Sequence, residues 1–200
     1  MMTFDVERIN DALTLLGELL SSEGLGPYRV AVCGGAALIS CALVSRTTID
    51  VDVVAMLDEN AKLVSPDPMP PDLLRISQVV QRNLGLPDNW LNNGPSREPG
   101  GLFQVGLPLG FAQRLVSRDF GPSLTVFFSD RFDQIHFKVF AAVDSGPGRH
   151  TDDLLNLKPT SEEMVAASRW AMKHDPSPGF RLILMSMLQK LGYKDVTERL

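Results

Sequence analysis

The stretch YRVAVCGGAALISCALVSRTTIDVDVVAM, residues 28–56, decides the fold class and the candidate chemistry of this 200-residue chain. Residues 28–33 are apolar and rich in valine, which predicts a buried strand. A glycine pair, Gly34 and Gly35, then breaks the strand. Residues 36–44 are compact and apolar and predict a short helix, and residues 49–56 predict a second strand. A strand, a helix and a strand in this order indicate an α/β core.

The first half of the second predicted strand alternates between apolar and acidic residues. Ile49, Val51 and Val53 share one face, and Asp50 and Asp52 share the other, because successive side chains of a strand point to opposite faces. Two neighbouring carboxylates repel each other unless a cation lies between them. Magnesium prefers oxygen ligands of this kind and bridges them to triphosphate oxygens. We therefore predict a metal site at Asp50 and Asp52.

Gly34 and Gly35 let the backbone turn tightly and approach a ligand closely. They also open the predicted helix, whose first N–H groups and positive dipole end suit a phosphate. Taken alone, a glycine pair is more often only a turn between a strand and a helix. Arg46 has two interpretations: it pairs with Asp50 or Asp52, or it contacts phosphate.

The rest of the chain continues the mixed pattern and then becomes helical. Irregular segments are expected at 58–70 and 85–101, where Pro, Gly and Asn are dense and where Trp90 and Leu91 are the expected anchors. We predict a core domain over 1–145 and a C-terminal helical segment over 146–200, packed on the core. The further predicted elements are helices at 4–21, 73–84, 132–143, 151–157, 161–173 and 180–191, and a strand at 124–128.

Composition excludes several classes of protein. Hydrophobic residues make up 44% and charged residues 22% of the chain, which is typical of a globular protein and not of a disordered tail, a collagen-like fibre or a coiled-coil rod. The net charge of −5 argues against a protein that coats DNA. Cys33 and Cys41 lie in no metal-binding or redox motif, so we expect them to be reduced and buried in a cytoplasmic protein. We expect neither a signal peptide nor a membrane span.

A glycine pair at the start of a helix, followed by Asp-x-Asp on the next strand, resembles the signature of the nucleotidyltransferase superfamily. The chain looks most like its AbiEii-type branch, which includes toxins of bacterial toxin–antitoxin and phage-defence systems. The resemblance covers residues 28–181. Besides the glycine pair and the aspartates, it includes two further segments, LPDNWLNNG at 86–94 and SDRFDQIHFKVFAAVDSGPGRHTDDLLNL at 129–157.

The resemblance implies a mixed β-sheet core flanked by helices, with a C-terminal helical segment. It implies transfer of a nucleoside monophosphate from an NTP, with Mg²⁺ or Mn²⁺, to an acceptor hydroxyl on an RNA end such as tRNA, on a protein or on a small molecule. It further implies that Lys138 contacts the triphosphate and that Asp153 is the later catalytic acid. Its neighbour Asp152 could take this role in place of Asp153. Because a buried lysine is costly without a partner, we expect an anion beside Lys138.

Two departures from the family pattern keep a second hypothesis open. The family often has a basic residue followed by Asp ahead of Asp153, whereas this chain has Arg149 and His150. The strand at 124–128 carries no third carboxylate, and Asp130 and Asp133 just beyond it are expected to cap the next helix. The alternative is therefore a catalytically weak or inactive nucleotide-binding or interaction module, acting beside an antitoxin-like partner chain.

Overall fold

A computed structural model describes residues 3–200 and shows a mixed α/β fold. The chain forms two compact units, which we call the N-terminal unit, ending at Asp130, and the C-terminal unit, Arg131–Leu200. The predicted fold class is therefore confirmed. The division falls earlier than the predicted boundary at 145/146, because the helix that begins at Arg131 groups with the helices that follow it and not with the sheet.

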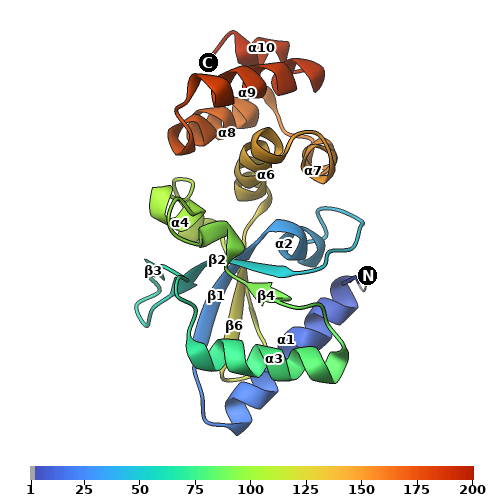
Figure 1. Cartoon of the computed structure of the whole chain (residues 1–200), viewed down its shortest axis with the longest axis vertical. Helices are drawn as coiled ribbons and strands as arrows, with labels where there is room; N and C mark the ends of the chain where they lie inside the picture. Colours follow the sequence, from blue (N-terminus) through green and yellow to red (C-terminus); the bar gives the residue numbers. More distant parts are fainter. Residues whose placement is uncertain (1–2) are drawn as a thin grey trace. The chain divides into compact units, whose positions relative to one another are not determined.

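The N-terminal unit is built on a mixed sheet with the strand order β3-β2-β1-β6-β5 (Figure 1). The short strand β4 pairs with β2 at the edge away from β1, in parallel. β1 and β6 are also parallel, and the remaining pairs are antiparallel. The strands are β1 (Tyr28–Cys33), β2 (Val51–Leu57), β3 (Leu63–Val64), β4 (Leu91–Asn92), β5 (Val116–Asp119) and β6 (Leu124–Phe128), and the helices are α1 (Val6–Ser22), α2 (Gly34–Ser40), α3 (Pro71–Leu84), α4 (Leu102–Val105) and α5 (Phe111–Arg114), with a 3-10 turn, η1 (Gly94–Ser96).

The hydrophobic core lies between one face of this sheet and the helices α1 and α3. Alternate residues of β1, β2 and β6 supply the sheet side, because side chains at i and i+2 share a face. Helical spacing brings the apolar faces of α1 and α3 onto them. The main contributors are Ile9, Leu13, Leu16, Leu20, Val30, Val32, Val51, Val53, Leu73, Ile76, Val80, Leu124, Val126 and Phe128.

The segments predicted to be irregular contain short regular elements, β3 within 58–70 and β4 and η1 within 85–101, which corrects both predictions. Trp90 holds the second segment in place, since its indole nitrogen donates to the Ser77 carbonyl at 2.9 Å and its ring stacks on Phe4. The backbone nitrogen of Val51 donates to the carbonyl of Trp90 at 2.5 Å. Trp90 and Leu91 are buried and are the anchors of this segment, as predicted.

Three further differences concern the end of α2, the strand β5 and the burial of one cysteine. α2 begins at the glycine pair and ends at Ser40, short of the predicted end at 44, because Ala42 adopts a left-handed φ of 54° that stops the helix. β5 follows α5 over residues for which no strand was predicted. Cys33 and Cys41 are both free, but only Cys33 is fully buried, so the expected burial holds for one of the two.

The C-terminal unit is entirely helical. Thr160 and Glu163 form the capping box predicted there: the Glu163 nitrogen donates to Thr160 Oγ1 at 3.2 Å, and the Thr160 nitrogen donates to Glu163 Oε2 at 2.8 Å. None of the helices found between residues 3 and 200 combines the length and the apolar character needed to cross a membrane. The helices are α6 (Arg131–Ser145), α7 (Arg149–Leu157), α8 (Ser161–His174), α9 (Pro178–Lys190) and α10 (Lys194–Thr197).

Candidate active site

Asp52 directs its carboxylate at the first residue of α2. Gly34 follows β1 with a φ of +68°, a conformation that other residues rarely adopt. A Cβ atom added to Gly34 would lie 2.7 Å from Asp52 Oδ2. Glycine at this position therefore serves two purposes: it makes the turn, and it leaves space for the Asp52 carboxylate.

Asp50 is connected to the second glycine through Thr48. A Cβ atom on Gly35 would overlap the hydroxyl oxygen of Thr48, which is buried. That hydroxyl donates a hydrogen bond to Asp50 Oδ1 at 3.2 Å. The two carboxylates predicted to act together are thus both linked to the glycine pair, Asp52 directly and Asp50 through one hydroxyl.

Arg46 brings a positive charge to the same place. A Cβ atom on Gly35 would lie 3.3 Å from Arg46 Nη1, and this nitrogen donates to the carbonyl of Thr47 at 2.7 Å. The guanidinium group therefore lies beside the backbone that was predicted to approach phosphate. We call Gly34, Gly35, Arg46, Thr48, Asp50 and Asp52 together the glycine–aspartate site.

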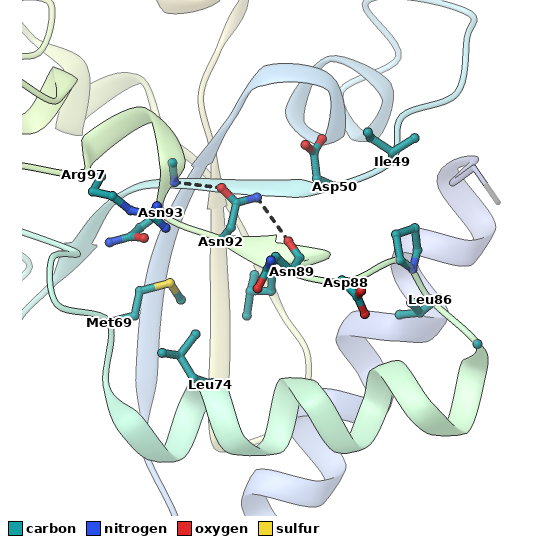
Figure 2. A pocket seen from close by; sticks show the side chains of 14 residues that line it. Ile49, Asp50, Met69, Leu74, Leu86, Asp88, Asn89, Asn92, Asn93 and Arg97 are labelled. Carbon is teal, nitrogen blue, oxygen red and sulfur yellow. Dashed lines mark hydrogen bonds between the residues drawn. The ribbon is translucent and has the colours of Figure 1, made fainter. Parts of the chain in front are cut away.

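Asn92 is a neighbour of the site that the sequence analysis missed. Asp52 pairs with Cys33 of β1 on one side and with Asn92 of β4 on the other. Residues paired across a sheet point to the same face, so the amide of Asn92 lies on the face of the Asp52 carboxylate. Asn92 and Asp50 line the same pocket, and the amide oxygen of Asn92 accepts from the Gly94 nitrogen at 2.7 Å (Figure 2). The segment LPDNWLNNG was the available signal, but its composition predicted only a loop.

The glycine–aspartate site offers two carboxylates, those of Asp50 and Asp52, to a divalent cation. In the described part of the chain, residues 3–200, no group of three or more His, Cys, Asp or Glu side chains could hold a metal. Mg²⁺ is, however, usually bound by one or two carboxylates, and water and substrate phosphates supply its other ligands. Asp50 and Asp52 would be the protein's share of such a site, and both are half-buried, so solvent and a ligand can reach them.

Lys138 and Asp153 form an ion pair within the C-terminal unit. Lys138 Nζ lies 2.9 Å from Asp153 Oδ2, and the two side chains are 6% and 1% exposed. The anion expected beside the buried lysine is therefore Asp153, the residue expected to be the later catalytic acid. Asp152, the possible replacement, is exposed in the first turn of α7. The structure thus brings Lys138 and Asp153 together, and the glycine–aspartate site belongs to the other unit.

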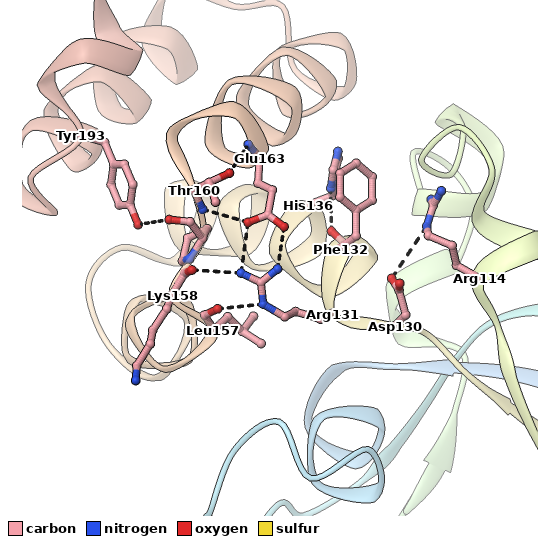
Figure 3. A network of polar contacts seen from close by, with 11 residues as sticks. Arg114, Asp130, Arg131, Phe132, His136, Leu157, Lys158, Thr160, Glu163 and Tyr193 are labelled. Carbon is pink, nitrogen blue, oxygen red and sulfur yellow. Dashed lines mark hydrogen bonds and ion pairs between the residues drawn. The ribbon is translucent and has the colours of Figure 1, made fainter.

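Arg131, which the sequence analysis did not single out, organises the turn between α7 and α8 (Figure 3). Its guanidinium donates to the carbonyls of Leu157 and Lys158, both at 2.9 Å, and binds Glu163 through two nitrogens. The hydrogen bonds from Arg131 are the main cause that lowers the pKa of the Glu163 carboxyl below its ordinary value. This network ties two helix ends together and is structural.

Asp130 and Asp133 were expected to cap the helix that follows them. Asp130 directly precedes α6 and lies 3.7 Å from Arg114 Nε, and Asp133 is buried in the first turn of α6. Among the described residues neither belongs to a group that could hold a metal.

The chain was compared with protein-family models, with curated proteins and with solved structures, and none of the three comparisons found a match.

Proposed function

We propose that this protein is a metal-dependent nucleotidyltransferase, which transfers a nucleoside monophosphate from an NTP to an acceptor hydroxyl. One observation carries the proposal: the carboxylate of Asp52, and through Thr48 that of Asp50, converge on the glycine pair that follows β1. The resemblance to the AbiEii-type branch extends the proposal to a role as the toxin of a bacterial toxin–antitoxin or phage-defence system, beside an antitoxin-like partner chain.

In the proposed reaction the acceptor oxygen forms a bond to the α-phosphorus of the NTP. The bond from that phosphorus to the bridging oxygen breaks, pyrophosphate leaves with the electron pair, and the hydroxyl proton passes to solvent. Mg²⁺ or Mn²⁺ would neutralise phosphate charge and lower the pKa of the acceptor hydroxyl. Asp50 and Asp52 would hold the ion, the Gly34–Gly35 backbone would approach the phosphates, and Arg46 would supply positive charge. Positioning and electrostatics account for most of the rate in such reactions.

The roles proposed for Lys138 and Asp153 require their ion pair to open. Lys138 would contact the triphosphate only after exchanging the carboxylate of Asp153 for a phosphate, and Asp153 would then be able to assist the acceptor. Their present burial against each other favours the second candidate, a nucleotide-binding or interaction module without transferase activity.

Thermal unfolding tests the proposed site without assuming an acceptor. The full chain is heated with each of the four NTPs, in Mg²⁺ and in Mn²⁺. A ligand at a hundred times its Kd stabilises the folded state by about 2.7 kcal/mol, which raises the melting temperature by a measurable amount. We expect a metal-dependent rise with at least one NTP, and its loss in Asp50→Asn and in Asp52→Asn.

Asp11→Asn is the matched control, because Asp11 is an exposed aspartate on α1, outside the site. It should keep the full rise in melting temperature. If no NTP changes the melting temperature with either metal, or if Asp52→Asn responds like the unmodified chain, the site is not a metal–nucleotide site. Incubation with α-labelled NTP and cellular RNA or protein then separates the two candidates, since only a transferase labels an acceptor.

A further inference from the structure

A pocket of 790 Å³ in the N-terminal unit begins at Asp50 and extends along β4 to α3 (Figure 2). Gly34, Gly35, Arg46 and Asp52 are outside its lining. The pocket has the size of cavities that hold ligands of one or two rings with their substituents. Asp50 is therefore shared between the glycine–aspartate site and a second space.

The two spaces lie on different sides of β2. At Asp52, β1 flanks β2 on one edge and β4 flanks it on the other. The glycine pair continues directly from β1, whereas the pocket is lined by β4 and the loops around it. In nucleotidyl transfer the attacking and leaving oxygens lie roughly in line across the phosphorus. If pyrophosphate leaves on the glycine side, the acceptor hydroxyl must arrive from the side of β4.

The lining of the pocket combines apolar side chains with polar groups, some hydrogen-bonded within the protein and others not. Some polar groups are already used within the protein: Asn93 Nδ2 donates to Pro66 and to Asp67, and Asp88 accepts from Gln81 at 2.6 Å. These bonds shape the wall. The apolar part includes Ile49, Met69, Leu74, Leu86 and Leu91.

Arg97 is the cation of this pocket. Its guanidinium makes no hydrogen bond or ion pair with any other residue of the described range 3–200, and the same holds for the amide group of Asn89. Arg97 is exposed and lies where the chain leaves η1. A guanidinium binds phosphate or carboxylate with two parallel hydrogen bonds, which makes it selective for anions.

We propose that this pocket binds the acceptor, and that the acceptor is a polyhydroxyl compound with an anionic group. Its hydroxyl would lie at Asp50, its carbon skeleton on the apolar wall and its phosphate or carboxylate on Arg97. This inference rests on the proposed transferase function, because only that function gives Asp50 a reacting phosphorus. It adds the class of acceptor and makes Arg97 the residue that selects it.

NMR titration of the ¹⁵N-labelled full chain tests the inference without turnover. The probes are ribose 5-phosphate, gluconate and ribose, which carry a phosphate, a carboxylate and no charge. Each is added to the chain alone and to the chain with Mg²⁺ and an α,β-methylene NTP that cannot react. We expect saturable shifts of the backbone amides of Asn89, Asn92 and Arg97 with at least one anionic probe, and binding of ribose weaker by about tenfold.

Arg97→Gln should weaken binding of the anionic probe by about tenfold, to the level of ribose. Arg82→Gln is the matched control, because Arg82 is an exposed arginine at the end of α3, outside this pocket, and it should leave binding unchanged. Binding of both anionic probes, or of one, supports the proposal and identifies the anion. The proposal is overturned if ribose binds as tightly as the anionic probes. It is also overturned if no probe causes a saturable shift, either with the chain alone or with Mg²⁺ and the unreactive NTP present. This titration is independent of the NTP melting experiment. A result against acceptor binding in the pocket can therefore be distinguished from a result against the transferase proposal.

Discussion

Lys138 Nζ and Asp153 Oδ2 lie 2.9 Å apart, and together they place two opposite charges in the interior of the C-terminal unit. Each charge would be costly to bury alone, because the low dielectric of a protein interior disfavours an unpaired ion. The two side chains therefore depend on each other: removing one charge leaves the other buried without its ion-pair partner.

A double-mutant cycle on this pair should be strongly non-additive. Lys138→Met leaves the Asp153 carboxylate buried without its cation, and this should lower the free energy of unfolding by about 3–5 kcal/mol. The double variant Lys138→Met/Asp153→Asn contains no buried charge and should be more stable than Lys138→Met alone. Urea unfolding followed by circular dichroism measures all members of the cycle. Glu23→Gln, which breaks an exposed ion pair with Arg75, should change the free energy of unfolding far less, because solvent screens exposed charges. If the losses in free energy of unfolding of the two single variants simply add in the double variant, the two side chains do not depend on each other.

Gly34→Ala should damage the glycine–aspartate site beyond its cost in stability. Gly24→Ala is the matched control, since Gly24 has a φ of +67° against +68° for Gly34, and a Cβ atom there meets nothing within 4 Å. Both variants should lose roughly 1–2 kcal/mol of stability, because alanine is strained at a positive φ. Only Gly34→Ala pushes on the Asp52 carboxylate, so only it should reduce the NTP-dependent rise in melting temperature. Equal responses of the two variants to NTP would remove Gly34 from the site.

The C-terminal unit should lose stability in acid through Glu163. The hydrogen bonds from Arg131 lower the pKa of this carboxyl in the folded protein. Such a group stabilises the fold fully above its unfolded pKa, about 4.3 for glutamate, and the contribution is lost as the pH falls through the lower, folded value. Glu163→Gln should therefore be less stable than the unmodified chain at pH 7, with the difference shrinking in acid.

Urea unfolding at pH 7 and near pH 3 makes that comparison. The neighbouring Glu162 is the control, since its ion pair with Arg199, at 3.3 Å, is exposed to solvent. Glu162→Gln should change stability little at either pH. A Glu163→Gln difference that stays constant with pH would rule out the proposed linkage.

Gly17→Ala should reverse the usual effect of alanine in a helix. Alanine normally stabilises a helix interior by about 1 kcal/mol relative to glycine. A Cβ atom on Gly17 of α1 would overlap the backbone carbonyl of Phe120, which cannot rotate away as a side chain would. We expect a loss of about 3 kcal/mol or more in the free energy of unfolding. Gly179→Ala in α9, where the nearest atom lies 4.0 Å away, should be neutral or stabilising.

The strands that the sequence predicted best are the central ones. β1 and β6 span the predicted residues 28–33 and 124–128, because buried strands require a continuous apolar run that is visible in the sequence. β5 was missed because all four of its residues are exposed and carry no apolar pattern. β4 was missed because it has only two residues, too few to show the alternation of apolar and polar side chains that predicts a strand. Its pairing depends on Trp90 being buried against α3, which is a tertiary contact.

The candidate site was predictable in part for the same physical reason. The spacing of Asp50 and Asp52 and the glycine pair are local features, and the structure brings them to one place. Asn92 joins them only through strand pairing, and Arg131 forms its network only when two helix ends meet. Contacts between residues far apart in sequence leave no local pattern, so these residues could not be identified beforehand.

The division of the chain at Asp130 and Arg131 has an evolutionary consequence. The glycine–aspartate site is encoded entirely before this junction, and the charged pair of Lys138 and Asp153 entirely after it. Recombination between genes at this junction would exchange one unit for that of another protein and would keep all residues of each group on one gene segment. A chimaera joined here would therefore inherit the glycine–aspartate residues as a set, and comparing it with the parent chain would show what the Lys138–Asp153 unit adds.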